Sequence, residues 1–401
     1  MERLESDIVI AGGGIAGLTA AIAFAAERFR VVCVDSAPPV TEEGAASSDL
    51  RSTAFLMPSV ALFERAGLWR RLAPFGAALR IMRLADAGGV ENRIRRIADF
   101  AATEIGQEAF GYNLPNWLLR REMVAEIAGR DAVTLLAPAT VEGVVPRLRD
   151  VVVTLSGDRQ VRAPLLIAAD GRDSFVRSAL GIGVRTQRYG QKALVFAVAH
   201  DRPHEGVSTE IHRTGGPFTL VPLPDRDGQP MSAVVWMDRG AEATRLMGLA
   251  APAFNAALNA RACGVLGSLR LVGERRLWPI ISRQAERLAG PRTALVAEAA
   301  HVMPPIGAQG LNTSLADIAA LLDLVIAART AGQDIGAPDL LTRYARQRAP
   351  DVAMRAVGID MLNRAAMAEA QPIRDLRNVG LGLLHGATPL RHLAMRTGLG
   401  A

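Results

Sequence analysis

The amino-acid sequence predicts a mixed α/β (α+β) fold, with a β-α-β unit first, a β-rich middle and a helical end. Three observations support this prediction. A glycine-rich turn joins an apolar run to an alanine-rich helical pattern within the first 26 residues. Short β-rich runs separated by polar turns fill much of residues 133–240. From Thr313 to the end, the pattern is helical.

The composition limits the class of protein. At 401 residues the chain is long enough for two or three packed subdomains, and half of its residues are apolar, as in ordinary soluble proteins. The formal net charge is +6, and all but Lys192 of the 46 basic residues are arginine. The basic balance is compatible with a phosphorylated cofactor or an anionic lipid surface. The charges are scattered rather than grouped in a block, so we expect no nucleic-acid partner.

Cysteine usage and hydropathy indicate a cytoplasmic protein. Cys33 and Cys263 form neither a CxxC pattern nor a disulfide framework, which fits a reducing compartment. A strand pattern begins almost at the first residue, which leaves no room for a signal peptide. The apolar helical run 315–328 is broken by Asp317 and Asp323, so we expect no membrane-spanning helix. The expected location is cytoplasmic, or peripheral at the inner face of the membrane.

The first element in chain order is the β-α-β unit. Residues 7–10 have the pattern of a buried strand, residues 15–26 form an alanine-rich helix, and residues 31–34 form a second buried strand that ends at Asp35. Continuous apolar runs of this kind are typical of strands buried on both faces of a parallel sheet. The unit therefore predicts a parallel sheet at the start of the chain.

The turn inside this unit matches the G-x-G-x-x-G pattern. Gly12 permits a tight turn, Gly14 lets the backbone approach a pyrophosphate, and Gly17 lets the helix pack close to the sheet. The helix N-terminus, which begins with Ile15 and Ala16, offers unpaired N–H groups and partial positive charge to phosphates. The turn therefore predicts a phosphate-binding site, whereas the alternative is a tight structural turn.

An acidic residue completes the pattern. Asp35 lies 18 residues after Gly17, at the end of the second strand. A carboxylate at this place can accept hydrogen bonds from ribose hydroxyls and would repel a 2′-phosphate. The combination predicts a dinucleotide ligand, but it does not distinguish NAD from FAD.

Two later segments have related patterns. Asp170-Gly171 directly follows the apolar run 163–169, although such a pair is often only a turn. Residues 296–312 begin as a strand that ends in the acid Glu298 and continue as a rigid loop into a helix that starts near Leu311. In this loop, prolines fix the backbone and glycines allow a flat ligand to approach closely. The positive end of the helix would stabilise the negative charge of a reduced flavin.

Taken together, "GGGIAG", "ADGRDSFVR" and "AEAAHVMPPIGAQGLN" resemble the class A flavoprotein monooxygenases, which are FAD-dependent aromatic hydroxylases. "DLRSTAF" and "YGQKALVFAV" resemble the ubiquinone-biosynthesis hydroxylase branch of that family. The resemblance covers nearly the whole chain. It implies a Rossmann-like FAD-binding domain with an inserted β-sheet substrate domain and C-terminal helices. The implied bounds are 1–75, 100–182 and 275–345 for the FAD-binding domain, 76–99 and 183–274 for the substrate domain, and 346–401 for the helical region.

The resemblance also implies roles for single residues. Gly12, Gly14 and Gly17, with the intervening Ile15 and Ala16, would hold the FAD pyrophosphate, and Asp35 would hold the adenosine ribose. Arg51 matches a family arginine near the cofactor. Asp170 matches the middle motif, which supports the FAD domain and is linked to pyridine-nucleotide use. The loop along the isoalloxazine ring is matched by Pro305, Gly307, Gln309, Gly310, Leu311 and Asn312.

The sequence departs from the family pattern at two places. Ala297-Glu298 stands where the family usually has Gly-Asp, with the acid contacting the ribityl chain. Glutamate is one methylene longer, so the same hydrogen bond needs a slightly retracted backbone, and we expect FAD to be retained. Asn116 stands where many relatives carry an arginine near the flavin, and we count it among the cofactor-binding candidates.

The implied activity is hydroxylation of the aromatic ring of a polyprenylated phenol in ubiquinone biosynthesis. The resemblance implies that NAD(P)H or another electron donor reduces FAD transiently, that O2 forms a flavin C4a-hydroperoxide, and that the phenol ring receives the oxygen. No second G-x-G-x-x-G follows a strand, so a separate NAD(P)H domain is not expected. We identify no catalytic residue and no metal site, and we interpret His301 as a structural hydrogen-bonding residue.

Several alternatives stay open at this point. The same fold could act on a small soluble aromatic, or the chain could be a flavin-free accessory protein of a quinone-biosynthesis complex. Phe196, Phe218, Leu220 and Pro222 either line an apolar substrate site or pack the sheet. The C-terminal segment either contacts a membrane or a partner of the quinone-biosynthesis complex, or packs on the FAD domain.

Overall fold

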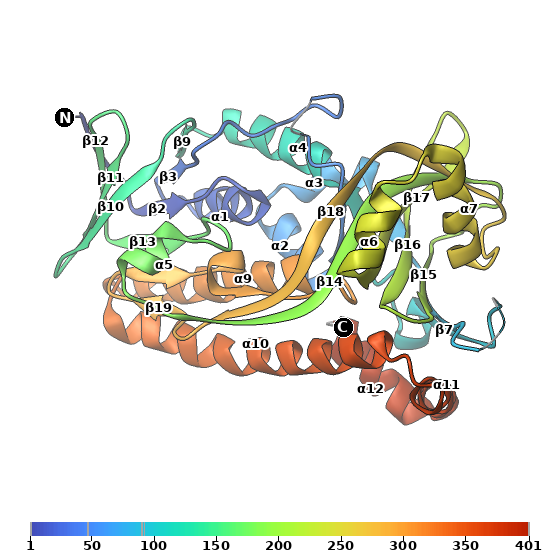
Figure 1. Ribbon diagram of the computed structural model, residues 1–401. Helices are drawn as coiled ribbons and strands as arrows, with labels where there is room; N and C mark the ends of the chain where they lie inside the picture. Colours follow the sequence, from blue (N-terminus) through green and yellow to red (C-terminus); the bar gives the residue numbers. More distant parts are fainter. Residues whose placement is uncertain (1, 46–47, 90, 92, 400–401) are drawn as a thin grey trace.

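The computed structural model describes residues 2–45, 48–89, 91 and 93–399 (Figure 1). A parallel sheet with its helices forms one side of the molecule, and a large, mainly antiparallel sheet forms the other. The long helix α10 (Pro338–Met367) runs beneath both sheets in this view. The mixed α/β fold predicted from the sequence is confirmed.

The parallel sheet forms as the apolar runs predicted. Its central strands pair in parallel, and their residues are fully buried because helices cover both faces. One short edge strand, β19, is antiparallel to its neighbour. In spatial order the strands are β19 (Ala289–Gly290), β20 (Thr293–Leu295), β13 (Leu165–Ala168), β2 (Ile8–Ala11), β3 (Val31–Val34) and β9 (Val133–Leu136).

Two helices dominate the core around this sheet. Helix α1 (Ile15–Ala26) is buried on almost every side because its alanines allow close packing. Helix α9 (Gln309–Thr330) is long and apolar enough to cross a membrane, but 61% of its most apolar stretch is buried inside the protein. Inside the fold, α9 is a core helix that packs against α1 and α10. The other helices on this side are α2 (Met57–Arg65), α3 (Trp69–Leu72), α4 (Asn116–Ala128), α5 (Phe175–Ala179) and α8 (Ala297–Ala300).

Two smaller sheets flank the parallel sheet. One is a meander at the edge of the molecule, with β1 (Glu2–Glu5), β12 (Arg159–Ala163), β11 (Val151–Leu155) and β10 (Val141–Pro146) in spatial order. The other faces the large sheet and contains β4 (Ser52–Leu56), β8 (Gly111–Pro115) and β5 (Ala77–Leu79). Two 3-10 turns, Ala73–Phe75 and Ala102–Ile105, lie near the small sheet.

The large sheet is tied to the parallel sheet by two long strands. β14 (Val184–His200) and β18 (Leu269–Ala285) pair along most of their length, from Val184 opposite Ala285 to His200 opposite Leu269. The order continues through β17 (Gln229–Arg239), β16 (Pro217–Arg226), β15 (Val207–His212), β6 (Ile81–Asp86) and β7 (Arg96–Ala101), and β21 (His301–Val302) lies at the other edge. The domain bounds implied by the resemblance stay a prediction.

Helices cover one face of the large sheet and the lower side of the molecule. α6 (Gly240–Met247) and α7 (Ala251–Ala262) pack on the large sheet over a core that contains Phe196, Phe218 and Leu220. After α10, the chain turns into α11 (Gln371–Gly386) and α12 (Thr388–Leu399), which lie below the large sheet in Figure 1. The helical end predicted from Thr313 onward is confirmed, although its first helix begins at Gln309.

Candidate functional site

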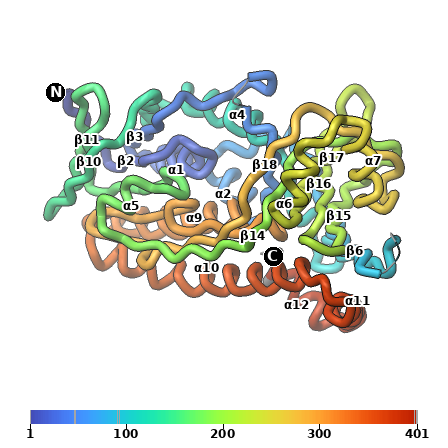
Figure 2. Tube along the Cα trace, viewed as in Figure 1, coloured from blue at the N-terminus to red at the C-terminus, as the bar shows by residue number. Residues whose placement is uncertain are grey.

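The candidate site lies at the carboxyl ends of the central parallel strands. Three segments that are far apart in sequence meet there, shown in blue, green and orange in Figure 2. Backbone hydrogen bonds fix their positions: Gly12 N–H donates to Val34 O at 2.7 Å, and Ala169 N–H donates to Ala11 O at 2.7 Å. Val296 N–H donates to Ala168 O at 3.0 Å. A crevice outside the carboxyl ends of parallel strands is the usual place of a ligand in such folds.

The glycines of the first motif have different physical roles. Gly12 has φ 103°, a left-handed value that glycine adopts freely, and a Cβ there would collide with the backbone of Ala169. A Cβ on Gly17 would collide with the carbonyl oxygen of Gly12. Gly14 has φ −70° and open space in front of its Cβ position. The turn therefore needs glycine at positions 12 and 17 for packing, whereas position 14 faces open space.

The first turn of α1 is free to accept an anion. Gly14 is the N-cap of this helix, no side chain caps it, and its first turn carries no acidic residue. The N–H groups that begin with Ile15 and Ala16 therefore face the open space in front of Gly14. Asp35 supports the turn, since its carboxylate accepts from Gly13 N–H at 2.5 Å and from Ala37 N–H at 2.9 Å.

The middle motif is held by its own hydrogen bonds. The carboxylate of Asp170 accepts from the hydroxyl of Ser174 at 2.5 Å and from Val176 N–H at 3.1 Å, at the start of α5. Arg177, which is buried, donates to Ala299 O at 2.8 Å. The motif thus fixes the loop after β13 against the turn after β20.

The acid Glu298 does not end a strand, and this part of the sequence prediction was wrong. Strand β20 ends at Leu295, and Glu298 lies in the short helix α8. The reason is the backbone of Ala297, whose φ of 55° turns the chain out of the sheet. Glu298 is exposed and forms an ion pair with Arg172 at 3.4 Å. Its carboxylate therefore lies on the surface of the crevice rather than in the sheet.

We expect Ala297→Gly to leave the free energy of unfolding nearly unchanged or to raise it by up to about 1 kcal/mol, because relief of the left-handed strain offsets the loss of a buried methyl group. Ala299→Gly is the matched control, since Ala299 lies in the same short helix without a left-handed φ. Loss of its buried methyl group should destabilise the protein by about 1 kcal/mol. Urea unfolding of both variants measures the two effects, and an equal loss of stability in both variants would contradict the prediction.

The loop before α9 divides into an open surface and a buried scaffold. Pro305 is exposed, and Gly307, Gly310 and Leu311 are half-buried, so this part of the loop is accessible to a ligand. A Cβ on Gly310 would meet open space. Gln309 and Asn312 are buried and hydrogen-bonded inside the protein instead.

Asn312 joins α9 to the small sheet. Its carboxamide oxygen accepts from Leu56 N–H at 2.8 Å and from the hydroxyl of Ser59 at 2.7 Å. Its NH2 group donates to Ala54 O at 2.8 Å and to Ala308 O at 2.6 Å. All hydrogen-bonding positions of this side chain are used, so it positions the loop through its contacts.

A buried polar network lies behind the same loop. Asp317 accepts from His301 at 2.6 Å and from Arg348 Nε at 2.8 Å, and its side chain is 1% exposed. Arg348 continues to Asp351 at 2.8 Å, and Arg355 links Asp351 to Gln309. The structural interpretation of His301 agrees with this arrangement.

A second charged cluster lies across the crevice. Asp49 accepts two hydrogen bonds from the Arg51 guanidinium, both at 2.8 Å, one from Arg51 N–H at 3.2 Å, and one from the Asn116 NH2 group at 2.9 Å. Arg120 lies 3.6 Å from the same carboxylate. The Arg51 guanidinium stacks 4.6 Å from the centre of the Trp278 ring. Sequence reasoning had missed Asp49, Arg120 and a site role for Trp278, although Asp49 stands two positions before the recognised arginine.

The charge state of Asp49 follows from these contacts. Burial by itself would raise the pKa of the carboxyl, but the hydrogen bonds and charge of Arg51, with Asn116 and Arg120, outweigh burial and lower the pKa from 3.8 to about 2. Arg51 is likewise held charged, since hydrogen bonding and charge from Asp49 raise its pKa despite burial, with a contribution from Glu298.

Because the pKa of Asp49 is lower in the folded state, its ionised form stabilises the protein above pH 4, and this stabilisation disappears as the pH falls through the folded value. The contribution is about 2 kcal/mol at pH 6 and about half of that at pH 3. We expect the stability difference between the protein and Asp49→Asn to shrink accordingly in urea unfolding between pH 6 and pH 3. A difference independent of pH would contradict the assignment.

An apolar cavity of about 400 Å³ opens beside this cluster, between the small and the large sheets. Leu50 and Ser52, which flank Arg51, belong to its wall. The other apolar residues of the lining come from the small-sheet side and from the large sheet. They are Phe75, Pro115, Trp117, Leu118, Ala197, Leu223, Pro224, Met231 and Val272. The remaining lining is polar, and it contains Glu43, Asp225, Arg226, Asp227 and Glu274.

Phe196, Phe218 and Leu220 do not line this cavity, and they pack the sheet as the second interpretation expected. Their rings and side chains point to the other face of the large sheet, where Phe196 lies 5.2 Å from Phe254 of α7, measured between ring centres. Successive residues of a strand face opposite sides, and here Ala197 faces the cavity while Phe196 faces the helices.

The residues of the crevice fit a flavin dinucleotide. The open space at Gly14 and Gly310 leaves room for a ligand against two helix N-termini. Two buried polar atoms beside the Asp49 cluster, the indole N–H of Trp278 and the hydroxyl of Ser48, have no hydrogen-bond partner among the described residues. A polar ligand in the crevice would complete such unsatisfied groups.

Comparisons with known proteins agree with this geometry. The family described as the FAD binding domain matches residues 5–358. The chain is 36% identical over 395 residues to the ubiquinone hydroxylase UbiL of Rhodospirillum rubrum, covering 98% of this chain and 90% of that protein. It is 27% identical over 402 residues to the 3-demethoxyubiquinol 3-hydroxylase of Escherichia coli, covering both chains fully.

A solved structure shows the same fold. The p-nitrophenol 4-monooxygenase PnpA of Pseudomonas putida superposes with a TM-score of 0.80 and 19% identity, covering 100% of this chain and 99% of that chain. The family match over most of the chain and the sequence relatives confirm the family that the three motifs indicated, FAD as the cofactor, and the ubiquinone-related branch. The chain therefore belongs to the FAD binding domain family, among the class A FAD-dependent aromatic hydroxylases.

Proposed function

We propose that this protein is a FAD-dependent monooxygenase that hydroxylates the aromatic ring of a polyprenylated phenol in ubiquinone biosynthesis. The observation that carries the proposal is the apolar cavity beside Arg51, because it offers an uncharged ring a place next to the crevice. The names of the sequence relatives support the pathway, since they are ubiquinone hydroxylases.

The cofactor contacts follow from the crevice. Gly12, Gly14 and Gly17 would shape the pyrophosphate site, with the N–H groups that begin with Ile15 and Ala16 as donors, while Asp35 would hold the ribose. Asp170 and Asn116 would act by holding the loops in place. Arg51 and Glu298 would approach the flavin from opposite sides of the crevice. The loop along the ring would consist of Pro305, Gly307, Gln309, Gly310, Leu311 and Asn312.

The chain's own residues would bind, orient and exclude water. When bound, FAD supplies the redox chemistry that activates O2, with NAD(P)H or another donor as the transient reductant. The Arg51–Asp49 pair keeps a fixed cation beside the Trp278 ring. Met303 and Ile306, at the loop before α9, pack on Met237 and Ile280 of the large sheet and close that side of the crevice to water.

The polar lining of the cavity argues against a small acidic aromatic as substrate. An acid would need an unpaired cation, and the one arginine among the described residues of the lining is Arg226, which is paired with Glu43. The other three carboxylates of the lining, Asp225, Asp227 and Glu274, would repel an anion further. A neutral phenol meets neither penalty, so these contacts favour the polyprenylated substrate.

Quinone-intermediate profiling in a deletion strain tests the proposal. We expect one under-hydroxylated polyprenylphenol to accumulate and to disappear when the intact gene is restored. An unchanged quinone pool would contradict the pathway. The accessory alternative is tested separately, since a purified protein that is colourless and takes up no added FAD would favour a non-catalytic role.

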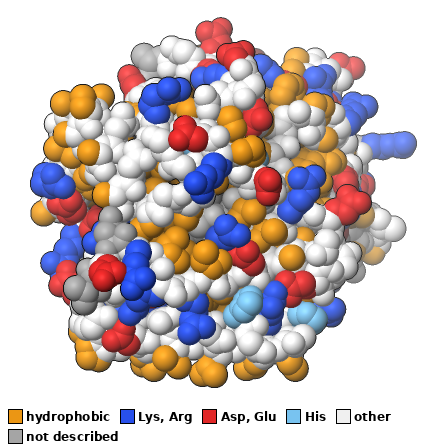
Figure 3. Space-filling view, turned by 90° about the vertical axis from the view of Figure 1, so that its right-hand side faces the viewer, with side chains coloured by type: hydrophobic (Ala, Val, Ile, Leu, Met, Phe, Trp, Pro, Cys, Tyr) orange, Lys and Arg blue, Asp and Glu red, His pale blue; other side chains and the backbone are white. Residues whose placement is uncertain are grey.

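A polyprenyl substrate also calls for contact with a membrane, and the C-terminal helices offer an apolar surface. We define the C-terminal apolar face as Met354, Val357, Met361, Leu362, Ile373, Leu376, Val379, Leu383, Leu390 and Leu393, all exposed. Hydrophobic side chains gather along the lower edge of Figure 3, where α11 and α12 lie. Exposed patches of this kind mark interaction sites. This supports a cytoplasmic protein that sits peripherally on the inner membrane face, alone or within a quinone-biosynthesis complex.

Vesicle flotation distinguishes direct binding to the membrane from binding within a quinone-biosynthesis complex. The purified protein should float with vesicles that contain anionic phospholipid, and Leu376→Gln with Leu383→Gln should reduce the bound fraction several-fold. Leu148→Gln is the matched control, because Leu148 is also highly exposed but lies in the distant meander. Binding that depends on added complex proteins rather than on lipid would place the contact in the complex.

A further inference from the structure

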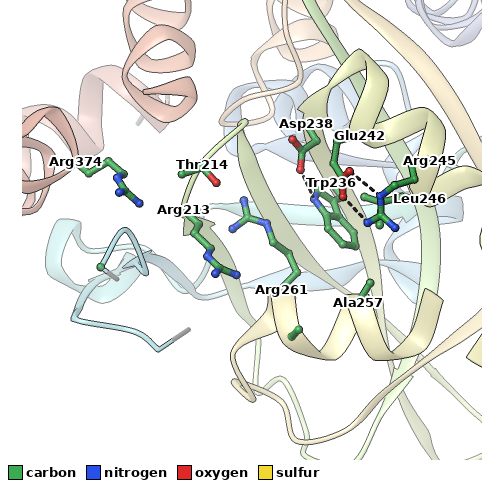
Figure 4. Close-up of a pocket in the computed structure, with 12 residues that line it drawn as sticks. Arg213, Thr214, Trp236, Asp238, Glu242, Arg245, Leu246, Ala257, Arg261 and Arg374 are labelled. Carbon is green, nitrogen blue, oxygen red and sulfur yellow. Dashed lines mark hydrogen bonds and ion pairs between the residues drawn. The ribbon is translucent and has the colours of Figure 1, made fainter. Parts of the chain in front are cut away.

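A second cavity lies on the other face of the large sheet. It has a volume of about 540 Å³ and is lined by Arg213, Arg261 and Arg374, with Trp236, Asp238 and the Glu242–Arg245 pair on its far side (Figure 4). Trp236 lines this second cavity, whereas Met231 lines the apolar cavity. Both residues lie on β17, and because they are an odd number of positions apart, their side chains point to opposite faces of the sheet. The sheet therefore separates the two cavities. We call this one the arginine cavity.

Arg261 is the unusual residue of the arginine cavity. It lies on α7, is 5% exposed, and uses Nη2 to donate to Gly216 O at 2.6 Å. Its Nε and Nη1 are buried without a hydrogen-bond partner among the described residues. A buried guanidinium with unused donors is costly, so native proteins normally satisfy it. Burial lowers the pKa of Arg261 to about 10, and the side chain remains charged at neutral pH.

The other two arginines approach the same space from different parts of the fold. In Figure 4, Arg213 extends from the end of β15 toward Arg261, and Arg374 approaches from α11. Neither has an ion-pair partner among the described residues, and the Nε of Arg374 is also buried without a partner. By contrast, Arg245 is neutralised by Glu242 at 2.6 Å.

The local charge indicates the ligand. Arg213, Arg261 and Arg374 face one carboxylate, Asp238, which leaves two positive charges. Asp238 is already engaged, because it accepts from Trp236 Nε1 at 3.3 Å and from Arg239 N–H at 2.8 Å. A phosphate dianion matches both the excess charge and the fork-shaped donors of arginine. The apolar side of the cavity, with Trp236 and Leu246, would accept the organic part of the ligand.

We propose that the arginine cavity is a binding site for a phosphorylated small molecule, distinct from the crevice and the apolar cavity. Its ligand would bridge α7, the end of β15 and α11. Binding there would fix α11, which carries part of the C-terminal apolar face, to the large sheet. The site does not depend on which ring the enzyme hydroxylates.

Thermal unfolding of the full-length protein in inorganic phosphate, at ionic strength held constant with NaCl, tests the site. The unfolding temperature should rise saturably with phosphate concentration, as it does when a ligand binds the folded state alone. Arg213→Gln should weaken the apparent affinity at least about tenfold, since it removes charge-assisted hydrogen bonds. The double variant Arg245→Gln with Glu242→Gln is the matched control and should keep the affinity, because it removes both members of an ion pair and leaves the net charge of the cavity unchanged.

Two further variants separate a ligand site from a structural role. Arg261→Met should abolish the phosphate response and also raise the unfolding temperature in phosphate-free buffer, because it removes a buried unpaired charge. Asp238→Asn should tighten phosphate binding, since it removes the one opposing charge. The proposal would be overturned if phosphate raised the unfolding temperature of all variants equally, or if it did not raise that of the natural protein. Competition by glycerol 3-phosphate or by phosphatidate vesicles then tells a soluble source of the phosphoryl group from a lipid one.

Discussion

Gly14→Leu is expected to give a folded protein that no longer retains FAD. The Cβ atom of the leucine meets no protein atom within 4 Å, and φ −70° is a value that leucine adopts without strain. Its side chain would instead occupy the space in front of the α1 N-terminus, where the pyrophosphate is proposed to lie. We expect the affinity for FAD to fall at least about 100-fold, which corresponds to about 3 kcal/mol.

The control for Gly14→Leu is Gly129→Leu. Gly129 is exposed at the end of α4, has φ −92°, and meets its nearest atom at an ordinary distance of 3.7 Å. Flavin absorbance after desalting gives the FAD content, and circular dichroism with urea unfolding gives the state of the fold. Retention of FAD at full stoichiometry by a folded Gly14→Leu would exclude this place for the pyrophosphate. A colourless Gly129→Leu would show that the loss is unspecific.

Asp317→Ala is expected to lower the free energy of unfolding by about 3 kcal/mol, because it removes the more buried of the two carboxylates that pair with Arg348 and leaves only Asp351. His301 and Ala297 N–H lose an acceptor in the same step. The effect should reach the flavin loop, since Arg348, Asp351 and Arg355 connect Asp317 to Gln309. FAD should therefore dissociate more readily from the variant at temperatures where it is still folded.

Asp323→Ala is the matched control on the same helix. Asp323 also forms an ion pair, with Arg65 at 2.5 Å, but its side chain is 64% exposed. Water screens such a pair, so the loss should stay below about 1 kcal/mol. Urea unfolding of the FAD-loaded and FAD-free forms measures both variants. Equal losses at positions 317 and 323 would show that the buried network contributes no more than a surface pair.

Local requirements of the backbone made the first part of the site predictable from the sequence. The β-α-β unit depends on apolar runs that are close in the chain, and the structure has the helix and second strand where the pattern placed them. Gly17 is required by the carbonyl oxygen of Gly12, five residues before it, whereas Gly12 also lies against Ala169 of a distant segment. The later loop was located for the same reason, because prolines and glycines restrict or free the backbone at their own positions. Even there, the left-handed Ala297 gave no signal in its residue type, so the turn that carries Glu298 out of the sheet was not foreseen.

The sequence by itself thus determined the fold class, the family and the places where the chain approaches a dinucleotide. Only the tertiary structure decided which face of each strand meets the cavity, since alternation separates Phe196 from Ala197 without saying which of them faces helices. It also decided that Asp49, Arg51 and Trp278 form one cluster, and that Arg213, Arg261 and Arg374 converge on the arginine cavity. Such groups come from elements far apart in the chain, so their energies arise from contacts that exist only after the sheets and helices have packed.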